Sequence, residues 1–291
     1  MGEIRIDGGT RLTGLIGGEV VTHSPSPTMH SASFSHNGIN AVYASLNVKE
    51  EELESAVRGL RALGFVGCNV TMPYKTAVPS MLDELSDAAE LMGAVNTIVV
   101  GEDGRLGGHN TDGAGFMRNA SQHGIALKGE TITVVGGGGA GSAIITQAAL
   151  DGVAKINVFN IKDPFFDQLK DKLDRLSKAT GAKTVLCDLE DKSALRSAIA
   201  ESKLFVNATR VGMAPLDDQC TIEEDMLHEG LVVADTVYLP RKTKLLAMAQ
   251  AHGNQTLDGV GMLLEQGSIA EQLWFGEYMD IPLIESEFFG Q

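Results

Sequence analysis

One stretch constrains the fold of this chain more than any other. Residues 131–150 read TITVVGGGGAGSAIITQAAL, an apolar run, then glycines at 136, 138 and 141, then a helix predicted to begin near Ser142. Glycine permits a tight turn and lets backbone N–H groups approach a pyrophosphate, whose charge the helix N-terminus favours. Because the spacing falls between a strand and a helix, it predicts a dinucleotide-binding βαβ unit rather than a merely flexible glycine turn.

Strands and helices alternate regularly after this unit. Candidate strands lie at 155–160, 184–189, 204–209 and 231–238, with amphipathic helices between them. This alternation is typical of a doubly wound parallel sheet. Past Leu245 the chain is predicted to be mostly helical to its end.

The first 112 residues form a second α/β region. Strands are predicted at 11–18, 41–48 and 65–71, and a hairpin is expected around Gly101–Gly104. Helical pieces are expected at 75–85 and 87–93. A further helix over 49–64 has an apolar stripe and ends at Gly64; the stripe consists of Leu53, Val57, Leu60 and Leu63. A connecting helix after Asp112 then leads into the second region.

Length and composition limit the function classes. A chain of 291 residues suggests two domains, and no segment approaches the ~20 apolar residues that a membrane span needs. The N-terminal sequence has no secretory pattern, so we expect a cytoplasmic protein. The net charge of −15 makes nucleic acid an unfavourable partner. The three cysteines form no C-x-x-C pair, which indicates neither a disulfide framework nor a metal site.

Polar residues at two places in the first region suggest a binding site. Ser24 and Ser26 lie two apart in a proline-stiffened loop, where both hydroxyls face one way if the segment is extended. Turn chemistry is the alternative for this pair. In the stretch NVTMPYK, residues 69–75, Val70 and Met72 are expected to face the core while Asn69 and Thr71 face the opposite side, and Pro73 turns the chain before Lys75. A surface lysine is the other reading of Lys75, and a helix N-cap is the other reading of Asp112.

The choice of dinucleotide depends on the residues after the strand at 155–160. A carboxylate there can hydrogen-bond the ribose hydroxyls and repels a 2′-phosphate, and Asp163 is the candidate. Lys162 argues the other way because a lysine can meet a phosphate as a point charge. A solvated Lys-Asp turn without either role remains open.

Taken together and in order, these motifs resemble the shikimate/quinate dehydrogenase family. The matching segments span Leu15 to Gln266 and read GLIGGEVVTHSPSPTMH, GFVGCNVTMPYK, GAVNTIV, GHNTDGAGF, VVGGGGAGSA, NATRVGM, DTVYLP and DGVGMLLEQG. The resemblance implies a substrate domain with a mixed sheet over residues 1–112, completed by C-terminal helices within 255–291. It also implies a Rossmann-type NAD(P)-binding domain over 113–254, with the substrate in a cleft between the domains.

The resemblance also implies the site residues. Lys75 and Asp112 correspond to the catalytic acid–base pair. The residues that correspond to substrate ligands are Ser24, Ser26, Tyr43, Asn69, Thr71, Lys75, Asn96, Asp112 and Gln266. The residues that correspond to the cofactor site are Gly136, Gly137, Gly138, Gly139, Ala140, Gly141, Asn160, Ile161, Lys162, Asp163, Arg210, Thr236, Val237, Tyr238, Leu239 and Gly259.

The implied activity interconverts shikimate and 3-dehydroshikimate, or quinate and 3-dehydroquinate. Hydride attack on a ring carbonyl leaves an alkoxide, which needs a proton and a nearby positive charge, and a lysine ammonium supplies both. No metal site is expected, and a homodimer is a family-level expectation.

One departure from the family pattern and one further resemblance bear on specificity. NADP-preferring members commonly carry Asn-Arg-Thr where this chain has Asn160-Ile161-Lys162-Asp163, so NAD is the expected cofactor, with NADP use also open. The segment NIKDPFFDQ and the chain length resemble the dual-specificity quinate/shikimate branch. An aminoshikimate-type or other cyclitol acid dehydrogenase, and a non-catalytic metabolite sensor, are the alternatives.

Overall fold

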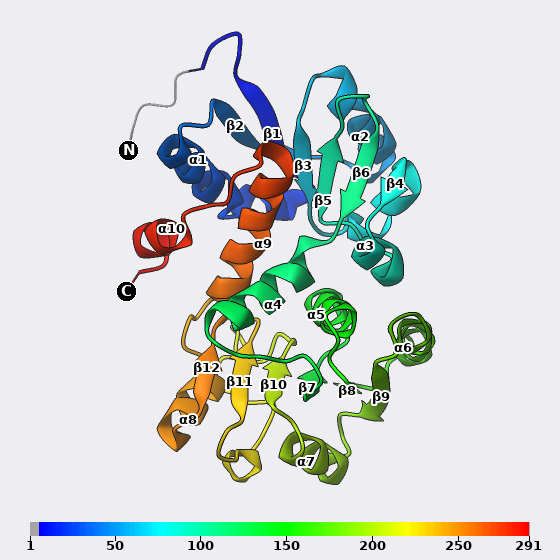
Figure 1. Cartoon of the computed structure of the whole chain (residues 1–291), viewed down its shortest axis with the longest axis vertical. Helices are drawn as coiled ribbons and strands as arrows, with labels where there is room; N and C mark the ends of the chain where they lie inside the picture. The colour runs from blue at the N-terminus through cyan, green and yellow to red at the C-terminus, as the bar shows by residue number, and fades with distance from the viewer. Residues whose placement is uncertain (1–5, 291) are drawn as a thin grey trace. The chain divides into compact units, whose positions relative to one another are not determined.

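The computed structural model describes residues 6–290, which form two α/β units (Figure 1). Unit 1 contains the chain up to Thr111 and again from Leu264, and unit 2 contains 112–263. The sequence placed the boundaries after 112 and after 254; residues 1–5 and 291 of the predicted first domain lie outside the described part. The second boundary falls inside one helix, α9 (Gly259–Phe275).

Unit 1 is built on a six-stranded mixed sheet with the order β2-β1-β3-β5-β6-β4. Its strands are β1 (Arg11–Gly17), β2 (Ala41–Asn47), β3 (Gly67–Val70), β4 (Glu84–Leu85), β5 (Thr97–Val100) and β6 (Leu106–His109). Strand β1 pairs in parallel with β2 and β3, whereas β5 pairs antiparallel with both β3 and β6. This arrangement confirms the expected mixed sheet and the hairpin.

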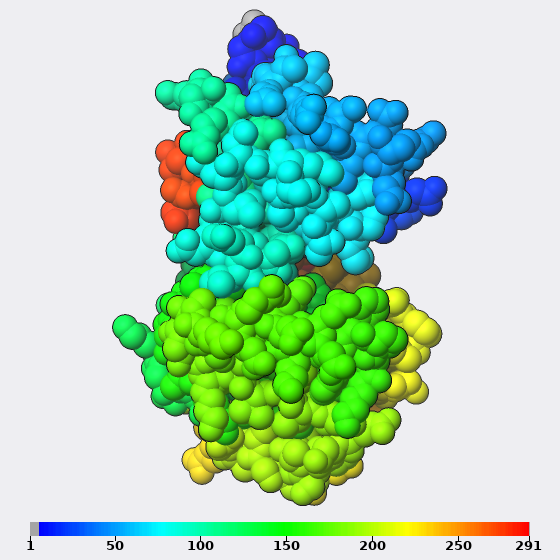
Figure 2. Space-filling view, turned by 90° about the vertical axis from the view of Figure 1, so that its right-hand side faces the viewer, coloured from blue at the N-terminus to red at the C-terminus, as the bar shows by residue number. Residues whose placement is uncertain are grey.

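The side-chain alternation of the strands gives this sheet two buried faces. Ile16, Val70 and Ile98 pack on the side of α2 (Leu53–Ala62) and α3 (Asp87–Met92). Leu15 and Tyr43 point to the opposite side, where α1 (Ser26–Asn37) and the second half of α9 cover them (Figure 1). A short helix, α10 (Ile281–Phe288), follows and contacts α1. In Figure 2 the light-blue to cyan segment, which contains α2, forms the outer surface of unit 1 on the side shown.

Unit 2 has six strands with only parallel pairings between neighbours. The strands are β7 (Thr131–Val135), β8 (Lys155–Asn160), β9 (Lys183–Asp188), β10 (Leu204–Asn207), β11 (Val232–Asp235) and β12 (Gln255–Leu257). Their order is β12-β11-β10-β7-β8-β9, so the chain starts in the middle and winds outward both ways. This is the doubly wound dinucleotide-binding topology, which confirms the predicted fold class.

Helices cover both faces of the unit 2 sheet. They are α4 (Thr111–Gln122), whose first residue belongs to unit 1, α5 (Gly139–Leu150), α6 (Phe166–Thr180), α7 (Lys192–Ala200) and α8 (Lys244–His252). The green surface in Figure 2 is the α5 to α7 part of this unit.

Short 3-10 turns occur in both units, at Glu19–His23, Glu50–Glu52, Tyr74–Thr76, Val78–Met81 and Glu224–Met226. No helix in the described residues is long and apolar enough to span a bilayer.

The structure corrects several sequence expectations. Strand β12 was missed, because three residues are too few to show a period of two. Leu63 is 69% exposed because α2 ends one residue before it. The predicted helix over 75–85 consists of 3-10 turns followed by β4, and α5 begins at Gly139 rather than near Ser142. Met72 is 65% exposed rather than buried, since β3 ends at Val70 and the alternation stops there.

Candidate active site

Ser24 and Ser26 bring their hydroxyls together at the start of α1. The Ser24 hydroxyl donates to the Ser26 hydroxyl over 3.1 Å, and the Ser26 backbone N–H donates to the Ser24 oxygen over 3.2 Å. Ser26 is the first residue of the helix rather than part of an extended loop, because Pro25 already has helical dihedrals. The two hydroxyls therefore converge through a helix-start turn and not through strand alternation.

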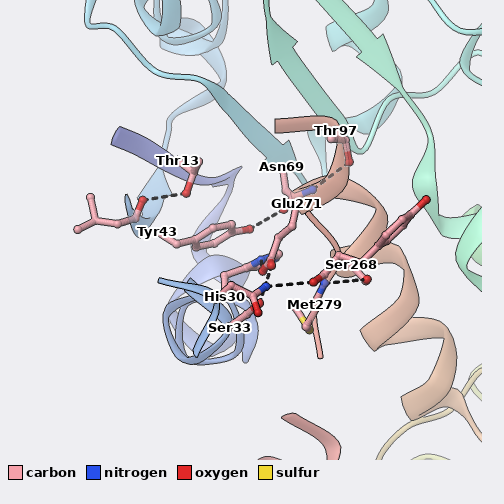
Figure 3. A network of polar contacts seen from close by, with 12 residues as sticks. Thr13, His30, Ser33, Tyr43, Asn69, Thr97, Ser268, Glu271 and Met279 are labelled. Carbon is pink, nitrogen blue, oxygen red and sulfur yellow. Dashed lines mark hydrogen bonds and ion pairs between the residues drawn. The ribbon is translucent and has the colours of Figure 1, made fainter. Parts of the chain in front are cut away.

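Tyr43 and Asn69 continue this polar cluster under α1 and α9 (Figure 3). The Tyr43 hydroxyl donates to the Asn69 side-chain oxygen over 2.8 Å. Burial raises the pKa of Tyr43 well above its usual value, nearby Cys68 raises it further, and a hydrogen bond with the Ser26 side chain acts in the opposite direction. Tyr43 is thus a neutral phenol at physiological pH and links the serine pair to Asn69.

The Asn69 side chain braces the ends of two strands. Its amide nitrogen donates to the Asn96 carbonyl over 3.2 Å and to the Thr97 hydroxyl over 2.9 Å. The residue is 6% exposed. Asn69 faces the side opposite Val70, as the alternation predicts, and its amide is engaged within unit 1.

Asn96 extends the same chain of hydrogen bonds toward α4. Its side-chain oxygen accepts from the Thr97 hydroxyl over 2.9 Å and from the Thr111 backbone N–H over 2.8 Å. Its amide nitrogen donates to the Thr111 hydroxyl over 3.0 Å. One connected network therefore contains five predicted substrate residues, Ser24, Ser26, Tyr43, Asn69 and Asn96.

The remaining predicted residues of unit 1 lie on separate segments. Lys75 occupies a 3-10 turn, is partly exposed, and accepts a hydrogen bond from the Val95 backbone N–H over 2.8 Å through its carbonyl. Thr71 follows β3 and is partly exposed, and its N–H donates to the Ile16 carbonyl over 2.8 Å. Gln266 lies partly exposed on α9. Asp112 begins unit 2 in the first turn of α4, where the helix dipole favours a carboxylate.

The glycine loop of unit 2 forms a tight turn between β7 and α5. Gly136 has φ of +102°, and a Cβ there would lie 2.7 Å from the Ala208 carbonyl oxygen. A Cβ on Gly141 would overlap the Gly136 carbonyl, whereas Gly138 and Gly139 have open space around them. The loop thus exposes the start of α5 in the way that an anion-binding turn requires.

The segment after β8 is held by its own side chains. The Asn160 side-chain oxygen accepts from the Gly137 backbone N–H over 3.0 Å, which ties this segment to the glycine loop. One Asp163 carboxylate oxygen accepts from the Phe165 N–H over 2.9 Å, and Lys162 forms an exposed ion pair with Asp188 at 3.3 Å. Asp163 therefore has a local role in the turn that precedes α6.

Asp235 ties the loops that follow β10 and β11. One carboxylate oxygen accepts from the Asn207 amide and from the Val237 N–H, each at 3.0 Å, and the other accepts from the Thr243 hydroxyl at 2.7 Å. Burial raises the pKa of Asp235 to about 6, against the lowering effect of these three hydrogen bonds. The carboxylate thus anchors the segment of predicted cofactor residues 236–239.

Gly259 and Arg210 complete the predicted cofactor set. A Cβ on Gly259 would lie 2.5 Å from the Thr236 carbonyl oxygen, so only glycine lets α9 start against that segment. Arg210 is exposed on the loop after β10, and Tyr238 and Leu239 are 43% and 71% exposed. These residues follow the carboxyl ends of parallel strands, where ligands bind in open α/β sheets.

Sequence reasoning missed four members of these networks. Thr97 and Thr111 connect the Asn96 side chain, and Asn207 and Asp235 connect the loops of unit 2. Asn207 and Asp235 carry a readable signal, since each is a polar residue ending an otherwise apolar strand. Thr97 and Thr111 have no such signal, because threonine is common in strands and at helix starts.

Comparison with known proteins identifies close relatives. A family profile described as "Shikimate dehydrogenase substrate binding domain" matches residues 15–98. The shikimate dehydrogenase (NADP(+)) of Listeria monocytogenes serotype 4b is 46% identical over 286 residues, 98% of each chain. Streptococcal relatives at 43–45% identity carry the same name.

Solved structures agree with this comparison. A Listeria monocytogenes shikimate 5-dehydrogenase in complex with shikimate and NAD superposes with a TM-score of 0.95 at 45% identity, over 99% of both chains. A quinate dehydrogenase from Corynebacterium glutamicum in complex with NAD superposes with a TM-score of 0.86 at 32% identity, over 97% of this chain and 99% of that one.

The expectation that NAD is the favoured cofactor is wrong by this comparison. The curated relatives are named for NADP(+), although the two similar structures described above contain NAD. A competing role for the carboxylate is present in the turn after β8. The Asp163 carboxylate, on which the expectation rested, accepts a hydrogen bond from the Phe165 N–H in its own turn.

Proposed function

This chain belongs to the shikimate dehydrogenase family, and from that membership we propose that it interconverts shikimate and 3-dehydroshikimate with NADP(H). The observation that carries the proposal is the hydrogen-bond network of unit 1. It joins residues from β2, β3, the start of α1 and the segment before β5 that are separated by up to 72 positions, from Ser24 to Asn96.

The substrate carboxylate is assigned to the serine pair. Hydroxyl groups donate to a carboxylate without burying a second charge, and the Ser24 and Ser26 oxygens already lie within 3.1 Å of each other. Thr71, Asn96 and Gln266 are assigned to the ring hydroxyls, for which amide and hydroxyl groups act as donor or acceptor. Tyr43 and Asn69 hold these groups in place.

Lys75 is assigned as the general acid for reduction and Asp112 as its partner in proton transfer. An ammonium group both donates a proton and stabilises the negative charge that develops on the carbonyl oxygen. In the oxidation direction the neutral amine accepts the hydroxyl proton.

The residues of unit 2 fit a dinucleotide. The open space at Gly138 and Gly139, at the start of α5, suits a pyrophosphate. NADP, when bound, supplies or accepts the hydride. Lys162 is assigned to the 2′-phosphate, which a lysine can meet as a point charge. Asn160 holds the glycine loop through its hydrogen bond from the Gly137 N–H. Residues 236–239 are assigned to the opposite side of the cofactor site.

Quinate is proposed as a second substrate of the same site. The similarity to the quinate dehydrogenase of Corynebacterium glutamicum supports this extension, because the reaction differs only in the ring substituents. A homodimer remains a prediction from family resemblance.

An initial-rate matrix tests the proposal. Purified enzyme is assayed with shikimate and with quinate against NADP and NAD, following the reduced cofactor by absorbance. We expect the highest kcat/KM with shikimate and NADP. Absence of oxidation of either acid with either cofactor would sink the proposal.

A further inference from the structure

We propose that His30 and Glu271 are positioning residues for the substrate site. They form a buried polar pair that fixes α1 against α9 and thereby places Ser26 and Tyr43 on one side and Gln266 on the other. The inference rests on the proposed function, because it assigns a role to groups that contact no substrate themselves.

The pair is fully enclosed. The His30 Nδ1 atom lies 2.7 Å from one carboxylate oxygen of Glu271, and both side chains have 0% exposure. The Ser33 hydroxyl donates to the other carboxylate oxygen over 2.5 Å. Figure 3 shows both α1 side chains directed at the carboxylate that descends from α9. Three groups from two helices thus converge on one point.

Stability alone does not account for a carboxylate at this place. The surroundings are an apolar cluster that includes Leu15, Phe34 and Trp274. Removing a carboxylate from water is costly, and well-packed apolar residues of similar volume often match or exceed the stability of a buried ion pair. A hydrogen-bonded pair supplies direction and register, which an apolar contact does not.

Both members lie close along their helices to predicted substrate residues. His30 follows Ser26 by four positions on α1, so it lies one turn away on the same helix face. Its ring stacks on Tyr43 with ring centroids 4.3 Å apart and planes 13° from parallel. Glu271 follows Gln266 by five positions on α9. A shift of the pair therefore moves three groups of the site.

The contact between the helices leaves little room to absorb such a shift. A Cβ on Gly267 would lie 2.8 Å from the Met29 Cε atom and 3.3 Å from the His30 ring. Gly267 follows Gln266 directly, so side chains of α1 reach α9 beside that residue. The His30 Nε2 atom, buried and without a hydrogen-bond partner, adds no second anchor. The bond to Glu271 is the polar interaction that sets the position of the ring.

The test is the double variant His30→Phe/Glu271→Met, which keeps volume and ring stacking but removes the directional bond. We expect Tm to equal or exceed that of the wild type. The Kd of shikimate by calorimetry and its KM should rise about tenfold, comparable to losing one charge-assisted hydrogen bond. kcat should change less than about threefold and the KM of NADP should not change, a split that a merely structural role would not produce.

Two further variants complete the design. The single variant Glu271→Gln keeps an acceptor oxygen for His30. Its Kd for shikimate should therefore lie within about threefold of the wild-type Kd. Val57→Ala, buried on the opposite face of the sheet, should lower Tm without changing that Kd. This control separates loss of stability from loss of position.

The outcomes separate the two proposals. If the wild type oxidises shikimate and the double variant binds shikimate as tightly as the wild type does, the positioning role alone is overturned. A wild type inactive toward shikimate overturns the proposed function instead. If the double variant does not fold, Ser33→Ala, which removes one bond to Glu271, takes its place; a raised Kd supports the role and an unchanged Kd contradicts it.

Discussion

The Asn96 side-chain oxygen accepts a hydrogen bond from the Thr111 backbone N–H over 2.8 Å, so the residue before β5 holds the first residue of α4. Asp112, the proposed partner of Lys75, is the next residue along the chain. Asn96 thus has two tasks in the proposed enzyme, a contact to the substrate ring and the anchoring of the segment that carries Asp112.

Replacing Asn96 tests this double role. Asn96→Ala leaves the buried Thr111 backbone N–H without its acceptor, which should destabilise the protein by about 1–3 kcal/mol. kcat should fall together with the affinity for shikimate, because Asp112 loses its anchor. Calorimetric melting and initial rates measure both effects. An active variant with wild-type Tm would contradict the role.

Loss of either proposed proton-transfer group should abolish most turnover. Lys75→Ala and Asp112→Asn should each lower kcat by about 10²-fold or more, the usual effect of removing acid–base catalysis. Tm should stay near that of the wild type, because both residues are partly exposed. The matched control is Lys49→Ala, an exposed lysine of unit 1, which should keep full activity. Unchanged turnover in both test variants would refute the assignment.

Replacing Lys162 should weaken the binding of NADP, which carries a 2′-phosphate, and not the binding of NAD. Lys162→Ala removes a positive charge proposed for the 2′-phosphate, so the KM of NADP should rise about tenfold while that of NAD changes little. Lys172→Ala, an exposed lysine on α6, makes the same change in net charge and should leave both KM values unaltered. Direct cofactor binding by fluorescence gives a readout independent of turnover. Equal effects on both cofactors would exclude a phosphate contact.

Asp235 should make the stability of the protein depend on pH. Its pKa in the folded protein is about 6, above the ordinary value of 3.8, so the folded state favours the protonated form. The associated stabilisation is fully present below pH 3.8 and is lost as pH rises toward and through 6. Between pH 5 and pH 7.5 the loss amounts to about 1 kcal/mol.

The variant Asp235→Asn isolates this contribution. Asparagine does not titrate, so the Tm of the wild type relative to the variant should fall as pH increases from 5 to 7.5. A constant offset caused by altered hydrogen bonds does not change that slope. A Tm difference that stays the same across this range would show that the carboxylate ionises at its ordinary pKa in the folded protein.

The sequence determined much of the local structure for physical reasons that act over short distances. The apolar run 131–135, the glycines after it and the regular alternation of strands predicted the parallel sheet of unit 2. Alternation within residues 67–70 placed Asn69 and Val70 on opposite faces. Such patterns depend on neighbouring residues, so they can be read without knowing what packs where.

The alternation of apolar and polar residues gave a wrong prediction where a strand ended before the alternating pattern did. Met72 continues the apolar period of β3, yet it is exposed because the chain leaves the sheet after Val70. The carboxylate of Asp163 has the chemistry of a ribose ligand, but the backbone N–H two residues later is within its reach. The exposure of Met72 and the hydrogen bond of Asp163 both follow from the backbone path, which the local pattern of residues does not determine.

Tertiary structure alone decided which distant polar groups meet. His30 and Glu271 are 241 positions apart, and Asn207 and Asp235 are 28 apart, so no local spacing predicts either contact. A histidine or a carboxylate in an amphipathic helix is by default a solvated residue. Burial converts such a residue into a hydrogen-bonded partner, because an unpaired polar group inside a protein is costly. The sequence therefore determined the elements and the candidate groups, and packing determined which of them became one network.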